Sequence, residues 1–320
     1  MNRLSIRCLM TAALLAAYSQ TALGQEMPAE YQHVLRELGR QGDFKERVLK
    51  VNIPRNDLQV TVKGIATPTP FGFGGWVAMT TGDEGTEVMM GDLVLLEDEV
   101  NPVMSAILDN GLEVTALHNH FFWEQPRIFY MHVHGQGTAS DLTRKLKPAL
   151  SLIGKQVPPA APASGHDRPA TDKPQVSLDS EKLAKIIGHH GEWNGSVYKI
   201  TIGRSDFEMK QHGALINARM GLNTWAAFVG TNEKAAVAGD VAMQEHEVTP
   251  VLKALRNNGL DIVAIHHHMT EARPVVIFLH YWGTGPAERL AAGVQAALNQ
   301  LGKGSSRGRP TEKHSEQHQK

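Results

Sequence analysis

The chain of 320 residues lacks several features that would place it in a common class of proteins. It has a single cysteine and no excess of either charge, with 32 Lys+Arg against 33 Asp+Glu. This balance argues against a basic nucleic-acid-binding protein and against a disordered acidic chain. The hydrophobic content of 42 % is enough for one or two packed cores. Histidine, in contrast, is abundant, with 16 residues.

The single cysteine, Cys8, lies in a segment that we expect to be removed. Residues 1–24 have a basic start, an apolar stretch and a small-x-small pattern before Gln25, which is typical of a secretory signal peptide. We therefore expect cleavage near Gly24-Gln25 and a periplasmic or secreted protein. No apolar stretch reaches the roughly 20 residues that a membrane-spanning helix needs. Without cysteine, the mature chain can form no disulfide, thiolate metal site or thiol nucleophile.

The chain contains an internal repeat. Residues 99–137 align without a gap on residues 247–285, with 15 identities in 39 positions. The match extends upstream and includes the pairs Gly91-Asp92 and Gly239-Asp240. We predict two copies of one domain, repeat 1 at 28–152 and repeat 2 at 178–302. The other predicted segments are a Pro/Ala-rich linker at 153–177 and a polar, disordered tail at 303–320.

Both copies are expected to contain the same elements. In the first copy these are a helix at 31–38, strands near 48–53, 58–63, 75–80 and 88–96, a helix from Asn101-Pro102 to Asn110-Gly111, strands at 112–120 and 126–134, and a helix near 138–150. A polar residue before proline favours a helix start, and Asn-Gly favours a helix end. The closing strand–helix–strand–strand–helix order predicts an α+β fold of ferredoxin-like type, with helices on one face of an antiparallel sheet.

Histidines recur at equivalent positions of the two copies. The candidate metal ligands are His118, His120 and His132 in the first copy and His266, His268 and His280 in the second. Strand side chains alternate, so the two histidines of a His-x-His strand share one face. Imidazole suits zinc, copper, iron or nickel, and a third ligand would leave an open position for water. We therefore expect a transition metal, with zinc first.

Acidic residues near these strands could complete such a site. Glu97 and Glu99, with Glu245 and Glu247 in the second copy, end a neighbouring predicted strand and could bind the metal or orient a ligand. If the protein is an enzyme, we expect metal-assisted hydrolysis or hydration with Glu97 or Glu99 as the catalytic proton acceptor. No nucleotide cofactor is expected, because the Gly-rich segment 71–75 lacks the Lys-Ser/Thr of a phosphate-binding loop.

The place of His132 is an open question. In a regular hairpin it would lie opposite Val114, about 13 Å along the strand from His118, which is too far for one metal ion. Three alternatives remain. The pairing is bulged or shifted, or His132 completes a site with the other repeat across a pseudo-two-fold interface, or it is not a ligand. Any one histidine could also be a core residue that is hydrogen-bonded to the backbone.

Other repeated residues favour structural roles. Arg55 and Asp57, with their counterparts Arg204 and Asp206, are interpreted as an ion pair or turn, with a clamp for a substrate carboxylate as the alternative. The tryptophans Trp76 and Trp225 are expected in the core.

Several segments resemble the LppY/LpqO family, a bacterial family of unknown function whose mycobacterial members include lipoproteins. The segments are PRNDLQVTVKGI at 54–65, GWVAM at 75–79, MGDLVLLEDEVNPVMSAILDNGLEVTALHNH at 90–120 and PRIFYMHVHG at 126–135. The resemblance implies an exported protein with no established activity and supplies no catalytic residues. Because a usable lipid-attachment cysteine is missing, a free periplasmic protein is expected.

The sequence therefore predicts an exported protein that binds a transition metal through two His-x-His hairpins. The alternative is a metal-free binding module for a small molecule or cell-envelope ligand, in which the histidines line a groove or belong to the core. A scaffold without a ligand is a third interpretation.

Overall fold

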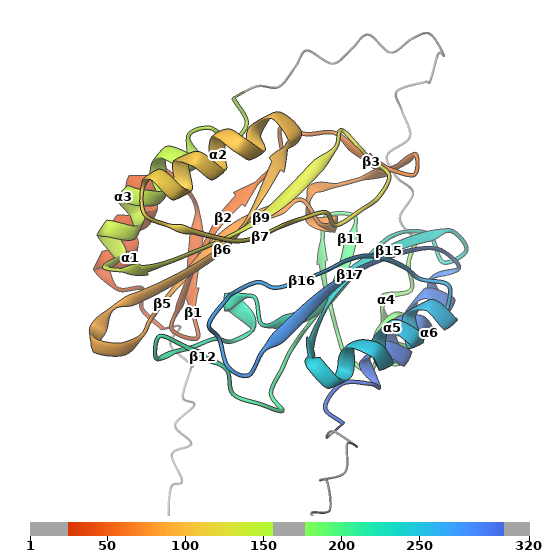
Figure 1. The fold of residues 1–320 in the computed structure, drawn as a ribbon. Helices are drawn as coiled ribbons and strands as arrows, with labels where there is room; N and C mark the ends of the chain where they lie inside the picture. Colours follow the sequence, from red (N-terminus) through yellow and green to blue (C-terminus); the bar gives the residue numbers. More distant parts are fainter. Residues whose placement is uncertain (1–24, 156–176, 304–320) are drawn as a thin grey trace, which may run out of the picture.

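The computed structural model describes residues 25–155 and 177–303. The predicted signal peptide and nearly all of the predicted linker and tail lie outside the described residues. The described chain forms two domains of the same architecture, each with a six-stranded sheet and three long helices (Figure 1). The internal repeat is therefore also a structural repeat. Among residues 25–155 and 177–303, none of the helices combines the length and the hydrophobicity that a membrane-spanning helix requires.

The first domain has a central sheet of strand order β1-β2-β5-β6-β9-β7, in which all neighbouring strands are antiparallel. Its elements are α1 (Ala29–Leu38), β1 (Gly42–Lys45), β2 (Val48–Pro54), β3 (Val60–Val62), β4 (Ile65–Thr67), β5 (Gly74–Thr81), β6 (Glu87–Leu96), α2 (Glu97–Asp109), β7 (Glu113–His118), β8 (Glu124–Gln125), β9 (Ile128–Gly137) and α3 (Ala139–Leu150). Strands β4, β3 and β8 form a separate small sheet.

The second domain repeats this order as β10-β11-β14-β15-β17-β16. Its elements are α4 (Ser180–Ile187), β10 (Glu192–Asn194), β11 (Val197–Gly203), β12 (Lys210–Gln211), β13 (Ala214–Leu215), β14 (Asn223–Gly230), β15 (Ala235–Gln244), α5 (Val248–Asn257), β16 (Asp261–His266), β17 (Val276–Gly285) and α6 (Ala287–Leu298).

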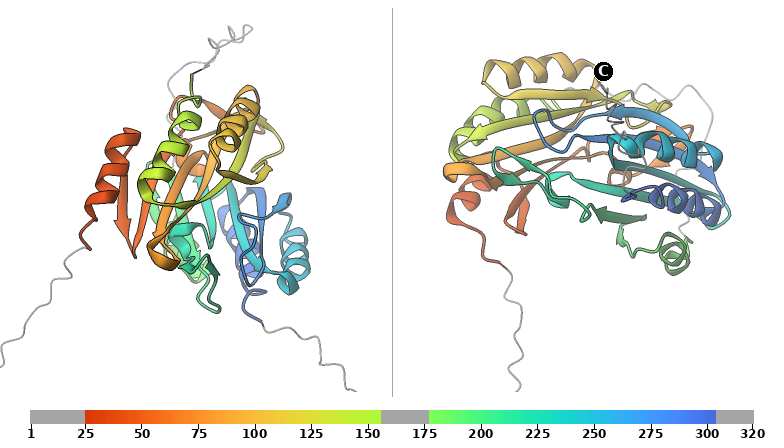
Figure 2. Two further views of the ribbon diagram at one scale, coloured as in Figure 1. Left: turned by 60° about the vertical axis from the view of Figure 1, so that its left-hand side comes forward. Right: turned by 60° about the horizontal axis from the view of Figure 1, so that its bottom comes forward.

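The predicted α+β class is confirmed. In each domain a strand–helix–strand unit has a third strand inserted between its two strands, as in a split β-α-β motif. Apolar residues of the three helices pack on one face of each sheet and form its own core. Figure 2 shows the helices on the outer sides of the molecule.

The faces without helices pack against each other. Two apolar clusters there combine residues of both domains, for example Met90 with Phe278 and Tyr130 with Trp282. Even-numbered residues of β9, including His132, point into this interface, because side chains alternate along a strand. The interface between the two sheets is thus where the candidate histidines lie.

The predicted start of the second helix of repeat 1 is wrong. Helix α2 begins at Glu97, and Pro102 lies inside it. The early start is stabilised by Glu99, whose carboxylate accepts a hydrogen bond from the backbone N–H of Leu96 at 2.7 Å. Three acidic residues in the first turn also interact favourably with the positive end of the helix.

Candidate metal centre

Six histidines gather between the two sheets. All six side chains are buried, with 2–9 % of their surface exposed, and they come from β7, β9, β16, β17 and the residues just after β7 and β16. They are His118, His120, His132, His266, His268 and His280. The structure thus brings together all of the histidines that the sequence analysis selected.

A bulge in each hairpin moves the third histidine into place. The pairing of β7 with β9 shifts between Val114 and Ala116, so that His132 lies opposite Ala116 and not Val114. As a result the rings of His118 and His132 stack with centroids 5.0 Å apart. The pairing of β16 with β17 shifts in the same way. Of the alternatives left open for His132, the bulged or shifted pairing is observed, so the distance of about 13 Å in a regular hairpin does not apply.

The cluster also crosses the domain interface. His118 Nε2 lies 3.2 Å from His280 Nε2 of the other domain. Ring centroids are 3.7 Å apart for His120 and His280 and 4.0 Å apart for His132 and His268. His132 of β9 therefore lies beside the His-x-His pair of the second domain, and His280 of β17 lies beside that of the first.

Two triads in this cluster could hold a metal ion. They are His118, His266 and His280, and His132, His266 and His268; in each triad one nitrogen per ring lies within 4.8 Å of the others. Both triads combine residues of the two domains. Tetrahedral zinc with Zn–N bonds of about 2.0–2.1 Å separates its ligand nitrogens by about 3.3 Å. The 3.2 Å between His118 and His280 matches this separation.

Backbone contacts orient two of the rings for coordination. His132 Nδ1 lies 3.2 Å from the carbonyl oxygen of Gly91, and His280 Nδ1 lies 3.2 Å from that of Gly239. A carbonyl oxygen only accepts hydrogen bonds, so Nδ1 must carry the proton in both rings. The lone pair is then on Nε2, which faces the cluster, as in protein metal sites where the second nitrogen is held by a carbonyl.

Burial keeps the six imidazoles neutral. Removal from water lowers the pKa of His132 to about 3 and that of His280 to about 3, although the carbonyl contacts partly offset the effect. Burial also lowers the pKa of the other four, and repulsion by neighbouring histidines adds to it. Neutral imidazole is the form that binds metals, so the whole cluster is in its ligand form at pH 7.

Two buried carboxylates lie beside the cluster. Asp92 Oδ2 is 3.9 Å from His120 Nε2, and Asp240 Oδ2 is 3.5 Å from His268 Nε2. Burial raises the pKa of Asp92 to about 7 and raises the pKa of Asp240 well above its usual range. Neither aspartate is among the residues predicted for the site from the sequence. The repeated Gly-Asp pair was the signal that could have identified them, because Asp92 and Asp240 pair across the sheet with His132 and His280.

The two glutamates proposed as catalytic are not brought to the histidines. Glu97 is exposed at the start of α2. The buried carboxylate of Glu99 accepts hydrogen bonds from Arg55 at 2.6 Å, from the N–H of Leu96 and from the N–H of Gly154. Their counterparts in the second domain are also one exposed and one buried glutamate.

In the second domain Glu245 is exposed, and Glu247 accepts a hydrogen bond from Arg204 at 2.8 Å. Arg55 also forms an ion pair with Asp57 at 2.8 Å, and Arg204 one with Asp206 at 2.7 Å. The interpretation of these pairs as structural agrees with the contacts. The expected role of Glu97 and Glu99 as proton acceptors therefore has no support from their positions.

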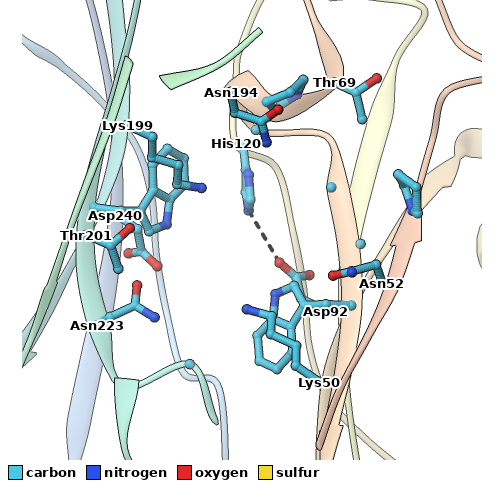
Figure 3. A pocket seen from close by; sticks show the side chains of 18 of the residues that line it. Lys50, Asn52, Thr69, Asp92, His120, Asn194, Lys199, Thr201, Asn223 and Asp240 are labelled. Atoms are coloured by element: carbon cyan, nitrogen blue, oxygen red, sulfur yellow. Dashed lines mark ion pairs between the residues drawn. The ribbon is translucent and has the colours of Figure 1, made fainter. Parts of the chain in front are cut away.

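A cavity of about 780 Å³ opens between the sheets beside the cluster. It is lined by equivalent residues of both domains, including His120, His268, Asp92 and Asp240 (Figure 3). Its wall also contains Lys50 and Lys199, whose ammonium groups lie 4.6 and 4.2 Å from the ring centroids of Trp76 and Trp225. These tryptophans were expected in the core, but they are half-buried and line the cavity.

Comparisons with known proteins identify a family but no activity. Two solved structures are similar: the trimeric bacterial microcompartment shell protein PduB, with 12 % identity over 81 % of this chain and 89 % of that chain, and EtuB from Clostridium kluyveri, with 9 % identity over 82 % and 89 %. Both have a TM-score of 0.20, which supports no argument about this protein. No curated protein matches the chain. A family model matches twice, over residues 32–152 and 181–300, and the chain belongs to that family, described as Domain of Unknown Function (DUF1259).

Proposed function

We propose that this protein binds a transition-metal ion, zinc first, through the histidine cluster between its two sheets. The observation that carries the proposal is the pair of histidine triads whose ligand nitrogens lie within 4.8 Å of one another. Burying six imidazoles without a ligand destabilises the folded state, because several of their nitrogens have no hydrogen-bond partner among the described residues. A cation bound in one triad would take one nitrogen from each of its three rings.

The chemistry expected of such a centre is metal-assisted hydrolysis. A bound metal ion would act as a Lewis acid toward a substrate in the adjoining cavity. Asp92 and Asp240 replace Glu97 and Glu99 as candidate proton acceptors, because they line the cavity beside the histidines. A carboxyl group with a pKa of about 7, as in Asp92, can take up and release a proton near neutral pH.

The test is the metal content of the mature protein purified without a histidine tag. After incubation with zinc, copper or nickel and removal of free metal, at least about one equivalent should remain bound, and less than about 0.2 equivalents would overturn the proposal. The variant His118→Ala/His280→Ala removes both nitrogens of the 3.2 Å pair and should lose the metal. The matched control His189→Ala/His190→Ala changes two exposed histidines and should keep it.

The metal-free binding module is the second candidate, and the cavity of about 780 Å³ is the observation that favours it. The two candidates differ in how they respond to a chelator. If the chelator leaves the melting temperature unchanged while a cell-envelope glycan or lipid raises it, the binding module is correct. Export, which the pattern of residues 1–24 predicts, is part of both proposals and is tested by cell fractionation.

A further inference from the structure

We propose that the cavity between the sheets binds a small dianionic molecule, a phosphate monoester or a dicarboxylate, through Lys50 and Lys199. This inference deepens the proposed function, because three of the six histidines line the same cavity. It specifies the chemical class of ligand that would be held beside the metal centre. The lysine contacts themselves do not require the metal.

The two lysines occupy equivalent places in the two domains. Lys50 lies on β2 opposite Ala78, and Lys199 lies on β11 opposite Ala227. Both alanines belong to the apolar clusters between the sheets, so both lysines point into the interface and not to the helical side. In Figure 3 the two side chains come from opposite walls of the cavity. A ligand between these walls can therefore meet a positive charge on each side.

Neither lysine has a counter-ion within reach. Among residues 25–155 and 177–303, no carboxylate oxygen lies within 4.0 Å of either ammonium nitrogen. The nearby Asp92 and Asp240 instead approach His120 and His268, at 3.9 and 3.5 Å. A charge in a poorly hydrated site is costly unless it is paired. An anionic ligand would supply the missing partner.

The electrostatics of the cavity agree with this interpretation. Burial lowers the pKa of Lys50 to about 8 and that of Lys199 to about 8, and the positive charge of Lys50 adds to the shift of Lys199. Both groups nevertheless remain mostly protonated at pH 7. The two positive charges repel each other across the cavity. A ligand with two negative charges can neutralise both, whereas a ligand with one negative charge cannot.

The remaining lining can add hydrogen bonds to an anion, and its two tryptophan rings are already covered. Asn52, Thr201 and Asn223 contribute amide and hydroxyl groups to the wall, which can donate hydrogen bonds to phosphate or carboxylate oxygens. Trp76 and Trp225 would be the platforms for stacking a sugar, but each already has a lysine ammonium over its ring. The volume of about 780 Å³ is in the range of small-molecule sites.

The experiment measures the melting temperature of the mature protein with inorganic phosphate, succinate or glucose, at constant ionic strength and in both the metal-loaded and the chelator-treated forms. We expect at least one dianion to raise the melting temperature and glucose to have no effect. In Lys50→Met/Lys199→Met the affinity should fall at least about tenfold. The matched control Lys147→Met/Lys253→Met changes two exposed lysines and should behave like the wild type.

Three results would overturn this inference: no shift with either dianion, an equal shift in the Lys50→Met/Lys199→Met variant, or a shift with glucose alone. If that variant does not fold, Lys50→Arg/Lys199→Arg keeps both charges, and loss of dianion binding in a folded arginine variant also counts against the inference. Metal content is measured in parallel. A protein that binds the dianion but no metal refutes the metal centre alone, whereas one that binds metal but no dianion refutes only this inference.

Discussion

The contacts of Glu99 predict that its removal destabilises the fold and leaves the proposed metal centre intact. The carboxylate accepts hydrogen bonds from Arg55 Nη1 at 2.6 Å and Nη2 at 3.3 Å, and from the N–H groups of Leu96 and Gly154, both at 2.7 Å. Arg55 is 2 % exposed and Glu99 3 % exposed, so water cannot replace these partners. Removing one member of a buried ion pair typically costs about 3–5 kcal/mol.

The Glu99→Ala variant should therefore melt well below the wild type. For a cooperative unit of this size, 1 kcal/mol corresponds to about 2–4 °C, so we expect a loss of about 6–20 °C. Glu97→Ala is the matched control, because that side chain is exposed in the same turn of α2, and its effect should stay within about 0.5 kcal/mol. Calorimetry and urea unfolding measure both variants.

A Glu99→Ala variant within about 1 kcal/mol of the wild type would refute the reasoning, because the ion pair would then contribute little. The double variant Arg55→Met/Glu99→Ala gives a second measurement. Its loss of stability should be smaller than the sum of the single losses, since Arg55 and Glu99 contact each other and Glu99→Ala alone leaves a buried guanidinium with Asp57 as its remaining carboxylate partner. A folded Glu99→Ala protein that has lost its metal would contradict the assignment of Glu99 to a structural role.

Three further predictions concern the cavity and the cluster. Succinate affinity should fall between pH 7 and pH 9, because Lys50 and Lys199, whose pKa values are lowered to about 8, lose their positive charges. Over the same range Asp92, with a pKa of about 7, gains a negative charge in the same cavity. Calorimetric titration at the two pH values measures the affinity, and a constant value would contradict the prediction. Gly239→Ala should lower the free energy of unfolding by about 1–3 kcal/mol, since a Cβ there would collide with the Trp225 carbonyl and the Tyr281 hydroxyl. Gly74→Ala, with open space around it, should be nearly neutral. Urea unfolding measures both variants. Zinc at 100 times its dissociation constant should stabilise the protein by about 2.7 kcal/mol, and an unchanged melting curve would argue against specific binding to the folded state.

The local pattern of the sequence was sufficient for the helices and most strands, because apolar periodicity and turn residues act over a few positions. The helix predicted at 138–150 is observed at Ala139–Leu150. The pattern Asn101-Pro102 predicts a later start for α2 than the observed Glu97, because proline favours the first turn of a helix. The hydrogen bond of Glu99 to the backbone of Leu96 begins the helix earlier, and this contact depends on the position of Arg55, 44 residues away.

The sequence also selected the six histidines that the fold brings together, but not their carboxylate neighbours. Duplication within the chain made His118, His120 and His132 stand out with their counterparts. Asp92 and Asp240 were visible only as part of a repeated Gly-Asp pair, since their burial and raised pKa values depend on strands that are distant in sequence. Lys50 and Lys199 could not be predicted from the sequence, because an isolated lysine on a strand is usually exposed and nothing nearby in the sequence indicates the cavity.

The sequence by itself determined that there are two copies of one α+β domain and which six histidines they share. Duplication and strand alternation can be recognised directly from the order of the residues. Only the tertiary structure decided how these histidines meet. A bulge shifts the strand register so that His132 approaches His118, and the packing of the two helix-free sheet faces joins histidines of both domains. Register and domain packing depend on contacts between distant residues, which local sequence patterns do not specify.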